Sequence, residues 1–294
     1  MNNYDDLLSN APDEGQSSRL SKEEYAAMKQ TERDGLYALS DVTAQEAAGD
    51  GDKFRQYLDV QGKLDRYSAV NALLILAQKP DATRLGDFDH WKERGGFVKR
   101  DQTGIAILEP HEYIKEDGTT GTGYNVKKVF DISQVDTRRM NISPLPSYDD
   151  RQLLRALIHK APMKISCAEK LPGDLGALTD PDTGEISVRK GMAFSDTFHC
   201  VSMELAAAVL AGSPNTQADP QFSAYCASYM LCVKYGVEAQ DYHFGDAPKV
   251  FGALDAQALK GEFQQIRDAA GDISGRMAKQ LDPLQKAAKT QDAR

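Results

Sequence analysis

The chain has 294 residues, a hydrophobic content of 41% and a net charge of −9, which fits one large or two modest globular domains. No stretch reaches the apolar length of a membrane helix. The polar, acidic first 20 residues lack the basic-then-apolar order of a signal peptide. We therefore expect a cytoplasmic protein without a membrane partner. The four cysteines form no C-x-x-C pair and predict buried free thiols.

Charge is distributed unevenly along the chain. Residues 1–52 hold 4 Lys/Arg and 12 Asp/Glu, a net charge of −8, whereas residues 53–139 hold 15 and 13, a net charge of +2. Residues 140–294 hold 16 and 19, a net charge of −3. An acidic balance argues against a general nucleic-acid binder. A nucleic-acid site is therefore expected only in the middle segment, where a local patch and base stacking would supply the affinity.

The first 64 residues predict a polar arm followed by two helices. Residues 1–20 contain few large apolar side chains and are expected to be disordered. Ser21 and Glu24 form a capping box that begins a helix, and Gly49-Asp50-Gly51 ends it. A second amphipathic helix follows, with its apolar positions at Phe54, Tyr57, Leu58 and Leu64.

Residues 66–108 carry the clearest local pattern. Ser68 is placed to cap a helix that ends at Lys79-Pro80. One face of this helix is apolar, at Val70, Leu73, Leu74 and Ala77, and another face can form hydrogen bonds, at Tyr67, Asn71 and Gln78. The only tryptophan, Trp91, follows among basic residues, and residues 105–108 form an apolar run that predicts a strand.

A hairpin is predicted next, with its tip at Asp117-Gly118 and Gly121–Gly123 and a return strand over residues 124–132. Residues 141–150 have the composition of a linker.

The second half predicts mainly helices. A turn at residues 180–184 precedes a strand at 185–189, and Ser195-Asp196 can cap the helix that follows. Another helix is expected at about 222–235. The last long helix, over about 255–280, repeats apolar or small residues in a heptad-like seam at Leu259, Phe263, Ile266, Ala270, Ile273 and Met277. Core packing and partner binding both explain this seam.

The motifs of the middle segment, taken together, resemble the N-terminal domain of the ArdC-like antirestriction proteins, which include the LtrC-like proteins of conjugative elements. The shared pattern reads Tyr67-Ser68-x-x-Asn71-x-x-Leu74-Ile75, Gln78-x-Pro80, Trp91-x-x-x-Gly95, Val98-Lys99, Gly104-Ile105-x-Ile107-Leu108, and the stretch Val129–Gln134. The order and spacing of these elements make the resemblance specific. It implies a single-stranded DNA-binding domain, followed by a zinc-peptidase-like domain.

On this resemblance, aromatic side chains would stack on bases while lysines and arginines meet phosphates. The candidate contacts are Arg66, Tyr67, Asn71, Gln78, Trp91, Lys92, Lys99, Arg100, Lys127 and Lys128. Core packing is the alternative for Tyr67 and Trp91, and a solvated surface is the alternative for the basic residues. Asn71 requires a partner if it is buried, and the protein's own backbone can provide one.

The metal motif that the resemblance leads us to expect is altered. The H-E-x-x-H sequence of a zinc peptidase is replaced by Met203-Glu204-Leu205-Ala206-Ala207, so that only Glu204 remains. The family's third ligand would fall near residues 223–225, which include no acidic side chain. Met and Ala do not replace imidazole on zinc. We therefore expect neither a catalytic residue nor a cofactor, as in a pseudo-metallopeptidase.

These observations predict an α+β fold in two domains. N-terminal helices on a small antiparallel sheet form a DNA-binding domain at 21–145, and a mostly helical, zincin-like domain without its metal site spans 146–294. The expected function is single-stranded DNA binding by an antirestriction-like protein of a mobile element, with restriction or conjugation proteins as further candidate partners. An acidic protein-interaction or DNA-mimic factor and a divergent metallopeptidase remain the alternatives.

Overall fold

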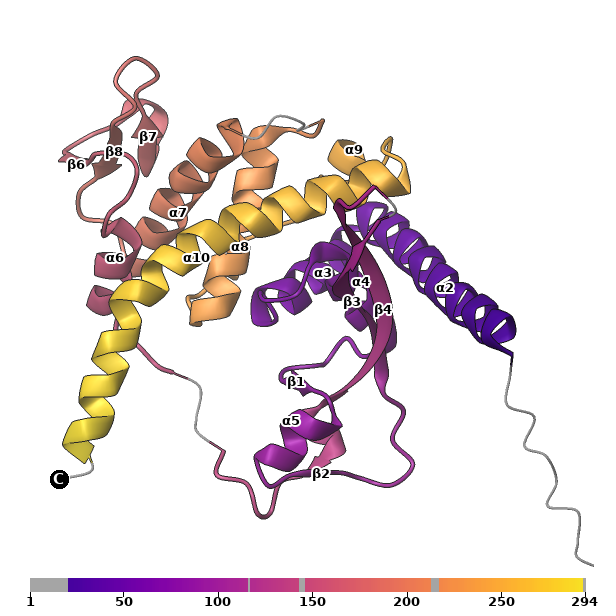
Figure 1. Cartoon of the computed structure of the whole chain (residues 1–294). Helices are drawn as coiled ribbons and strands as arrows, with labels where there is room; N and C mark the ends of the chain where they lie inside the picture. Colours follow the sequence, from indigo (N-terminus) through magenta and orange to yellow (C-terminus); the bar gives the residue numbers. More distant parts are fainter. Residues whose placement is uncertain (1–20, 116, 143–145, 213–216, 293–294) are drawn as a thin grey trace, which may run out of the picture.

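A computed structural model describes the protein over residues 21–115, 117–142, 146–212 and 217–292, with side chains described as far as residue 282 (Figure 1). The expected disorder of residues 1–20 lies outside these described residues. Helices and small sheets are combined in one chain, which confirms the α+β class.

Three helices begin the described chain: α2 (Lys22–Ala48), α3 (Gly51–Lys63) and α4 (Ala69–Gln78). The predicted capping box is present, because the Ser21 hydroxyl accepts from the backbone N–H of Glu24 while the Glu24 carboxylate accepts from that of Ser21. Ser68 caps α4 as predicted. Glycine at position 51, the first residue of α3, has a steric reason, since a Cβ there would lie 2.6 Å from the carbonyl oxygen of Phe244.

The predicted hairpin forms the main sheet. Strand β3 (Ile105–Ile114) pairs antiparallel with β4 (Thr120–Asp131), whose end pairs with β1 (Leu85–Gly86). The tip is shorter than predicted, because Gly121 and Gly123 lie inside β4, opposite Tyr113 and His111. A Cβ at either glycine would lie 2.7 Å from the facing ring, so these glycines make room for the rings across the strands.

A smaller pair of strands, one before the hairpin in the chain and one after it, lies near the short helix α5. Strand β2 (Phe97–Val98) pairs antiparallel with β5 (Val135–Asp136). Helix α5 (Phe88–Glu93) precedes β2, and the 3-10 turn η1 (Ile132–Gln134) joins β4 to β5. Figure 1 shows β1, α5 and β2 grouped at one end of the hairpin.

Two side-chain amides of α4 cover the second edge of β3. Asn71 donates to the carbonyl oxygen of Leu108 at 2.8 Å and accepts from its N–H at 2.9 Å. Gln78 makes the same pair of bonds to Ala106, each at 2.9 Å. The polar stripe predicted on this helix therefore acts as a substitute strand, and we call it the amide clamp. Because each buried backbone group would otherwise lack a partner, the clamp joins α4 to the sheet in a single register.

The second half contains a helical layer and a small sheet. Its helices are α6 (Asp150–Ile158), α7 (Phe194–Ala211), α8 (Pro220–Tyr235), α9 (Ala247–Phe251) and α10 (Ala256–Asp292). Its sheet has the order β6-β8-β7, with β6 (Ile165–Ala168), β7 (Ala177–Thr179) and β8 (Ile186–Arg189), and the 3-10 turn η2 (Pro172–Asp174) precedes β7. The expected cap at Ser195-Asp196 is wrong: the cap is Ala193, two residues before Ser195, and it makes no side-chain hydrogen bond.

One continuous core joins the two halves. The heptad-like seam of α10 is buried at every predicted position, which confirms the core-packing interpretation. Phe263 on this helix packs against Tyr57 and Phe54 of α3, with ring centroids 4.7 Å and 5.4 Å apart. In Figure 1 the yellow α10 runs from α9 past α8 and α7 to α6. The division near residue 145 stays a prediction, and the buried cluster extends across it.

The expectation of buried free thiols holds for two of the four cysteines, and Cys200 is half-buried. All four are free, and Cys226 and Cys232 are buried. Cys167, on the edge strand β6, is exposed, which the composition could not indicate. Among the helices that the structure describes, none combines the length and apolarity needed to cross a bilayer.

Candidate nucleic-acid interface

A pocket of about 500 Å³ lies where the two halves of the chain meet, and we call it the Tyr67 pocket. Its walls come from the start of α4, the segment of β1 and α5, the β3–β4 hairpin and one residue of α10. It is lined by Arg66, Tyr67, Ser68, Asn71, Leu85, Gly86, Asp87, His90, Ile107, Leu108, Glu109, Pro110, Tyr124, Lys127, Val129 and Arg267. The lining combines aromatic rings, backbone edges and charges of both signs.

A second hollow of about 420 Å³ adjoins the first, and we call it the Arg84 groove. The two share Arg66, Leu85 and His90 as a common wall. The charged residues that line the groove are Lys63, Asp65, Arg66, Arg84 and Arg94. Four cations and one carboxylate thus gather around one hollow of an acidic protein, so the lining of the groove is locally positive.

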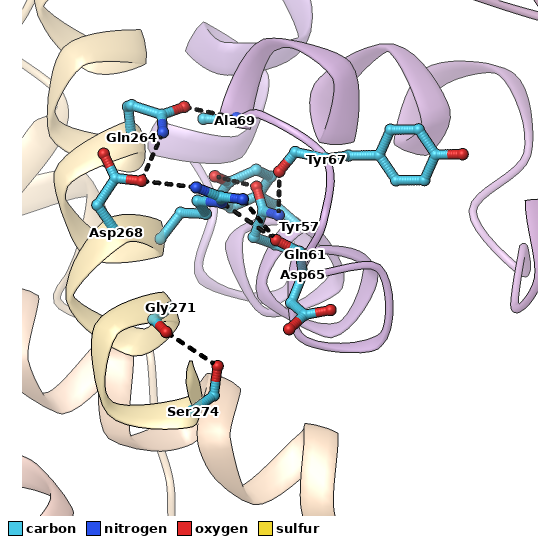
Figure 2. A network of polar contacts seen from close by, with 10 residues as sticks. Tyr57, Gln61, Asp65, Tyr67, Ala69, Gln264, Asp268, Gly271 and Ser274 are labelled. Atoms are coloured by element: carbon cyan, nitrogen blue, oxygen red, sulfur yellow. Dashed lines mark hydrogen bonds and ion pairs between the residues drawn. The ribbon is translucent and has the colours of Figure 1, made fainter. Parts of the chain in front are cut away.

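The loop before α4, which carries Arg66 and Tyr67, is held by α10 (Figure 2). Arg267 donates to the carbonyl oxygen of Asp65 through Nε at 3.1 Å and Nη2 at 2.9 Å. Gln264 accepts from the backbone N–H of Ala69 at 2.9 Å. Because these bonds fix the backbone on both sides of it, the Tyr67 ring points away from α10 in a defined direction (Figure 2).

Arg66 and Tyr67 form a pair at the boundary of the two hollows. The guanidinium carbon of Arg66 lies 5.0 Å from the centroid of the Tyr67 ring, and Nη2 donates to the Tyr67 hydroxyl at 3.1 Å. Nη2 also donates to the carbonyl oxygen of Leu85. Arg66 remains exposed and Tyr67 is half-buried. A flat aromatic surface therefore lies beside an exposed positive charge.

Lys127 lies between two carboxylates on the wall of the Tyr67 pocket. Its Nζ is 2.6 Å from Glu109 Oε1 and 2.9 Å from Asp87 Oδ2. The hydrogen bonds that Lys127 donates, first to Glu109 and then to Asp87, raise the pKa of Lys127 to about 12. The pKa of Asp87 is lowered, first by the backbone N–H of His90 and then by Lys127. The three groups together carry one net negative charge, so Lys127 is less available to a phosphate than the sequence implies.

His90 forms part of the wall between the two hollows. Burial lowers the pKa of His90, and the positive charges of Arg94 and Arg66 lower it further. Its ring meets that of Trp91 edge-on, with centroids 5.0 Å apart. A Cβ at Gly86 would lie 2.3 Å from the His90 ring, so only glycine at this position leaves the ring in place.

Several predicted contacts serve the fold instead of the surface. Trp91 is buried, donates from Nε1 to the carbonyl oxygen of Phe130 at 3.0 Å, and packs against Val135. Asn71 and Gln78 form the amide clamp. The core and backbone interpretations considered for Trp91 and Asn71 are therefore the ones the structure supports.

The remaining predicted contacts are exposed. Lys92, Arg100 and Lys128 lie on the surface, and so does Lys99, whose Nζ donates to the carbonyl oxygen of Ser133 at 2.8 Å. These four residues line neither hollow. Their place in a nucleic-acid interface stays a prediction.

The sequence interpretation missed much of the cationic lining. Arg84 and Arg94 flank α5 in the one positive segment, and that position was the available signal. Arg267 is separated from Asp65 by 202 residues, so no local pattern indicates their contact. Exposed aromatic rings in the same region were also missed, namely Phe88, Phe97, Tyr113 and Tyr124.

The residues at the altered metal motif do not fit zinc. Glu204 on α7 accepts a hydrogen bond from the hydroxyl of Thr179 on β7, and Met203 and Ala207 pack against the core. His199 contacts the carbonyl oxygen of Glu238 through Nε2 at 2.6 Å. Within the described parts of the chain, no three His, Cys, Asp or Glu side chains gather as metal ligands would. The chemistry of this donor set therefore supports no zinc peptidase step.

We expect the Glu204→Gln variant to match the parent protein in zinc content and in any activity found. Without a metal-bound water, the carboxylate has nothing to activate. Metal analysis of protein purified without a polyhistidine tag checks this expectation. Stoichiometric zinc that is lost in Glu204→Gln would contradict it, whereas a small change in melting temperature would reflect only the bond to Thr179.

Comparisons with known proteins place the middle of the chain in a family. The family model for the N-terminal domain of anti-restriction factor ArdC matches residues 45–141. None of the curated proteins matches the chain. Two crystal structures of antirestriction ArdC protein from the R388 plasmid are similar to it. The metal-free structure has 16% sequence identity and a TM-score of 0.44, with 72% of this chain and 86% of that chain covered. The Mn(II)-bound structure has 17% identity and a TM-score of 0.45, with 72% and 85% covered. Residues 45–141 of the chain therefore match the N-terminal domain of anti-restriction factor ArdC.

Proposed function

We propose that the protein binds single-stranded DNA through the Arg84 groove and the Tyr67 pocket, as an antirestriction-like factor of a mobile element. The observation that carries the proposal is the cationic groove beside an aromatic-lined pocket, both lying mainly within the matched residues 45–141. Proteins that bind single strands combine a positive groove along the backbone with aromatic side chains on which bases stack. The two adjoining hollows offer both parts.

Single strands suit this surface better than a duplex. Unpaired bases can leave the strand and enter a hollow, whereas the bases of a duplex remain stacked inside it. The net charge of −9 also disfavours a long polyanion that lies across much of the surface. Few phosphate contacts are available, which favours a short footprint centred on the groove.

The C-terminal half is proposed to act as a pseudo-metallopeptidase domain whose remaining role is support. Arg267 and Gln264 of α10 fix the loop that presents Arg66 and Tyr67. Under this proposal the boundaries 21–145 and 146–294 describe two parts with different roles that share one core. Restriction or conjugation proteins remain candidate partners for the surface outside the groove.

The test is binding of labelled single-stranded and duplex oligonucleotides to the full chain across a salt series. Each phosphate contact on a single strand contributes about −0.7 to the slope of log affinity against log salt. Three or four contacts in the groove give an expected slope of roughly −2 to −3. The double variant Arg84→Ala/Arg94→Ala should weaken binding to all sequences and make the slope shallower by roughly one unit.

A matched control removes the same charge elsewhere. Lys164, beside strand β6, pairs with Glu185, and Lys190, beside strand β8, pairs with Glu169. The Lys164→Ala/Lys190→Ala variant should leave the slope of log affinity against log salt unchanged. If the full chain shows no binding to single strands at low salt, the proposal is wrong. The interaction-protein alternative then takes its place, with the exposed Tyr25 and Met28 of α2 as the surface to examine.

A further inference from the structure

We propose that the Tyr67 pocket is a base-reading subsite that prefers nucleobases with an amino group, such as cytosine, over bases with a carbonyl group at the same position, such as uracil or thymine. The inference rests on the proposed function, because the base would enter the pocket as part of a strand that lies in the Arg84 groove. It adds a selectivity that binding of single strands alone does not require.

The size and walls of the pocket suit a single planar ring. Its volume of about 500 Å³ lies within the range of small-molecule sites. Tyr67 and Tyr124 contribute aromatic surface from two different elements, α4's leading loop and strand β4. The Arg66 guanidinium lies beside the Tyr67 ring, so a base could stack against either plane.

Hydrogen-bond acceptors exceed available donors on this wall. Lys127 directs protons to both Asp87 and Glu109, and Arg66 directs protons to the Leu85 carbonyl and the Tyr67 hydroxyl. Asp87 Oδ1 accepts from the backbone N–H of His90 at 2.8 Å and Asp87 Oδ2 pairs with Lys127, which also pairs with Glu109 Oε1, so the second oxygen of Glu109 is the acceptor offered to a base. A carboxylate accepts well from the amino group of cytosine, whereas a carbonyl oxygen at the same position would face it without a proton.

The same charge balance separates the base from its phosphate. A phosphate at the wall formed by Asp87, Lys127 and Glu109 would meet a group with one net negative charge, although Arg66 and Arg267 also line the pocket; the adjoining groove holds four cations and one carboxylate. Arg66 and His90 belong to both hollows. A nucleotide whose phosphate lies in the groove and whose base lies in the pocket would therefore cross the wall at these two residues.

The test compares oligomers of deoxycytidine and deoxyuridine of equal length, which differ in the amino or carbonyl group at ring position 4 and in the proton that only uracil carries on N3. Full-length protein is titrated with each at one salt concentration and pH 7.5, with fluorescence anisotropy as the readout. The deoxycytidine oligomer should bind about tenfold more tightly, in line with the usual discrimination of a side chain that pairs well with a base edge.

The diagnostic variant is Glu109→Gln. It keeps the shape of the side chain, replaces a carboxylate oxygen by an amide N–H₂ that can donate to a carbonyl, and leaves Lys127 paired with Asp87 alone. The preference for deoxycytidine should therefore fall at least fivefold while deoxyuridine binding holds or improves. The matched control is Glu112→Gln, because Glu112 is exposed on the same strand and lines no part of the pocket. Melting temperature confirms that both variants are folded.

Each outcome has a distinct meaning. Equal binding of the two oligomers by the parent protein overturns the base-reading subsite but leaves the proposed function in place. An equal loss for both oligomers in Glu109→Gln also overturns it, since Glu109 would then support the fold. Absence of binding by either oligomer at low salt rejects the proposed function together with the subsite.

Discussion

The Phe263→Ala variant is expected to lower the free energy of unfolding by about 3–5 kcal/mol, the usual cost of removing a buried phenylalanine. Phe263 on α10 is fully buried. Its ring packs against Tyr57 and Phe54 from α3 and lies 5.6 Å from Phe251, between centroids. Removing it would leave a cavity between the two halves of the chain, where neither half can close over the gap alone.

Urea or thermal unfolding of the full chain measures this effect, which corresponds to a fall in melting temperature of roughly 10 °C. The control is Phe97→Ala, because Phe97 on β2 is 55% exposed and its loss should change stability by no more than about 0.5 kcal/mol. If the two variants cost the same, the shared core does not stabilise the N-terminal part, and a fragment ending near residue 145 would be expected to fold independently.

The Asp131→Ala variant is expected to destabilise the protein by about 3 kcal/mol or more, because each buried donor left unpaired costs roughly 1–3 kcal/mol. Asp131 is 1% exposed and accepts from the backbone N–H groups of Thr83, Arg84 and Ser133, at 2.7, 2.9 and 3.0 Å. These bonds attach the loop that carries Arg84 to the end of β4. The variant should therefore also weaken DNA binding at the groove.

The dependence of stability on pH separates the contribution of the Asp131 charge from that of its side-chain shape. Burial raises the pKa of Asp131, but the backbone hydrogen bonds from Thr83, Ser133 and Arg84 together outweigh it and lower the pKa below its ordinary value of 3.8. A carboxyl group with a lowered pKa stabilises the fold above the unfolded value, and this contribution is lost as pH falls through the folded value. The parent protein should therefore lose stability below about pH 4, near the ordinary value for aspartate.

Asp131→Asn is the matched control for this test. It keeps one acceptor oxygen and cannot ionise, so its stability should be intermediate at pH 7 and should decline less between pH 5 and pH 3. Urea unfolding of both proteins at each pH provides the comparison. Parallel declines would show that Asp131 contributes no charge-dependent stability.

Local signals predicted much of the secondary structure correctly. The capping box at Ser21, the cap at Ser68 and the apolar strand after Gly104 depend on neighbours within a few residues, so the sequence contains all the information they need. The seam of α10 was also predicted correctly as a core face, because its spacing follows the helical repeat. The exception at α7 arose because its cap involves no side-chain hydrogen bond.

The candidate site could be predicted only in part, because its charges and walls come from distant segments. Asn71 and Lys127 have side chains that suit nucleic acid, yet one bonds to Leu108 and the other to two carboxylates. The Trp91 ring could stack on a base, yet it is already buried against Phe130. A residue's type states which contacts it can make, whereas the fold decides which contacts are already occupied.

The amide clamp has a consequence for the protein before it is fully folded. An uncovered strand edge is a template for pairing with another chain, and the apolar run Ile105–Leu108 would be a favourable one. Asn71 and Gln78 cover that edge only while α4 is docked on β3. Undocking of α4 would therefore expose this edge together with the apolar residues of α4 that pack in the shared core, and aggregation would be expected to start there. Solubility during synthesis and heating thus depends on two amide side chains that contribute nothing to the charge of the surface.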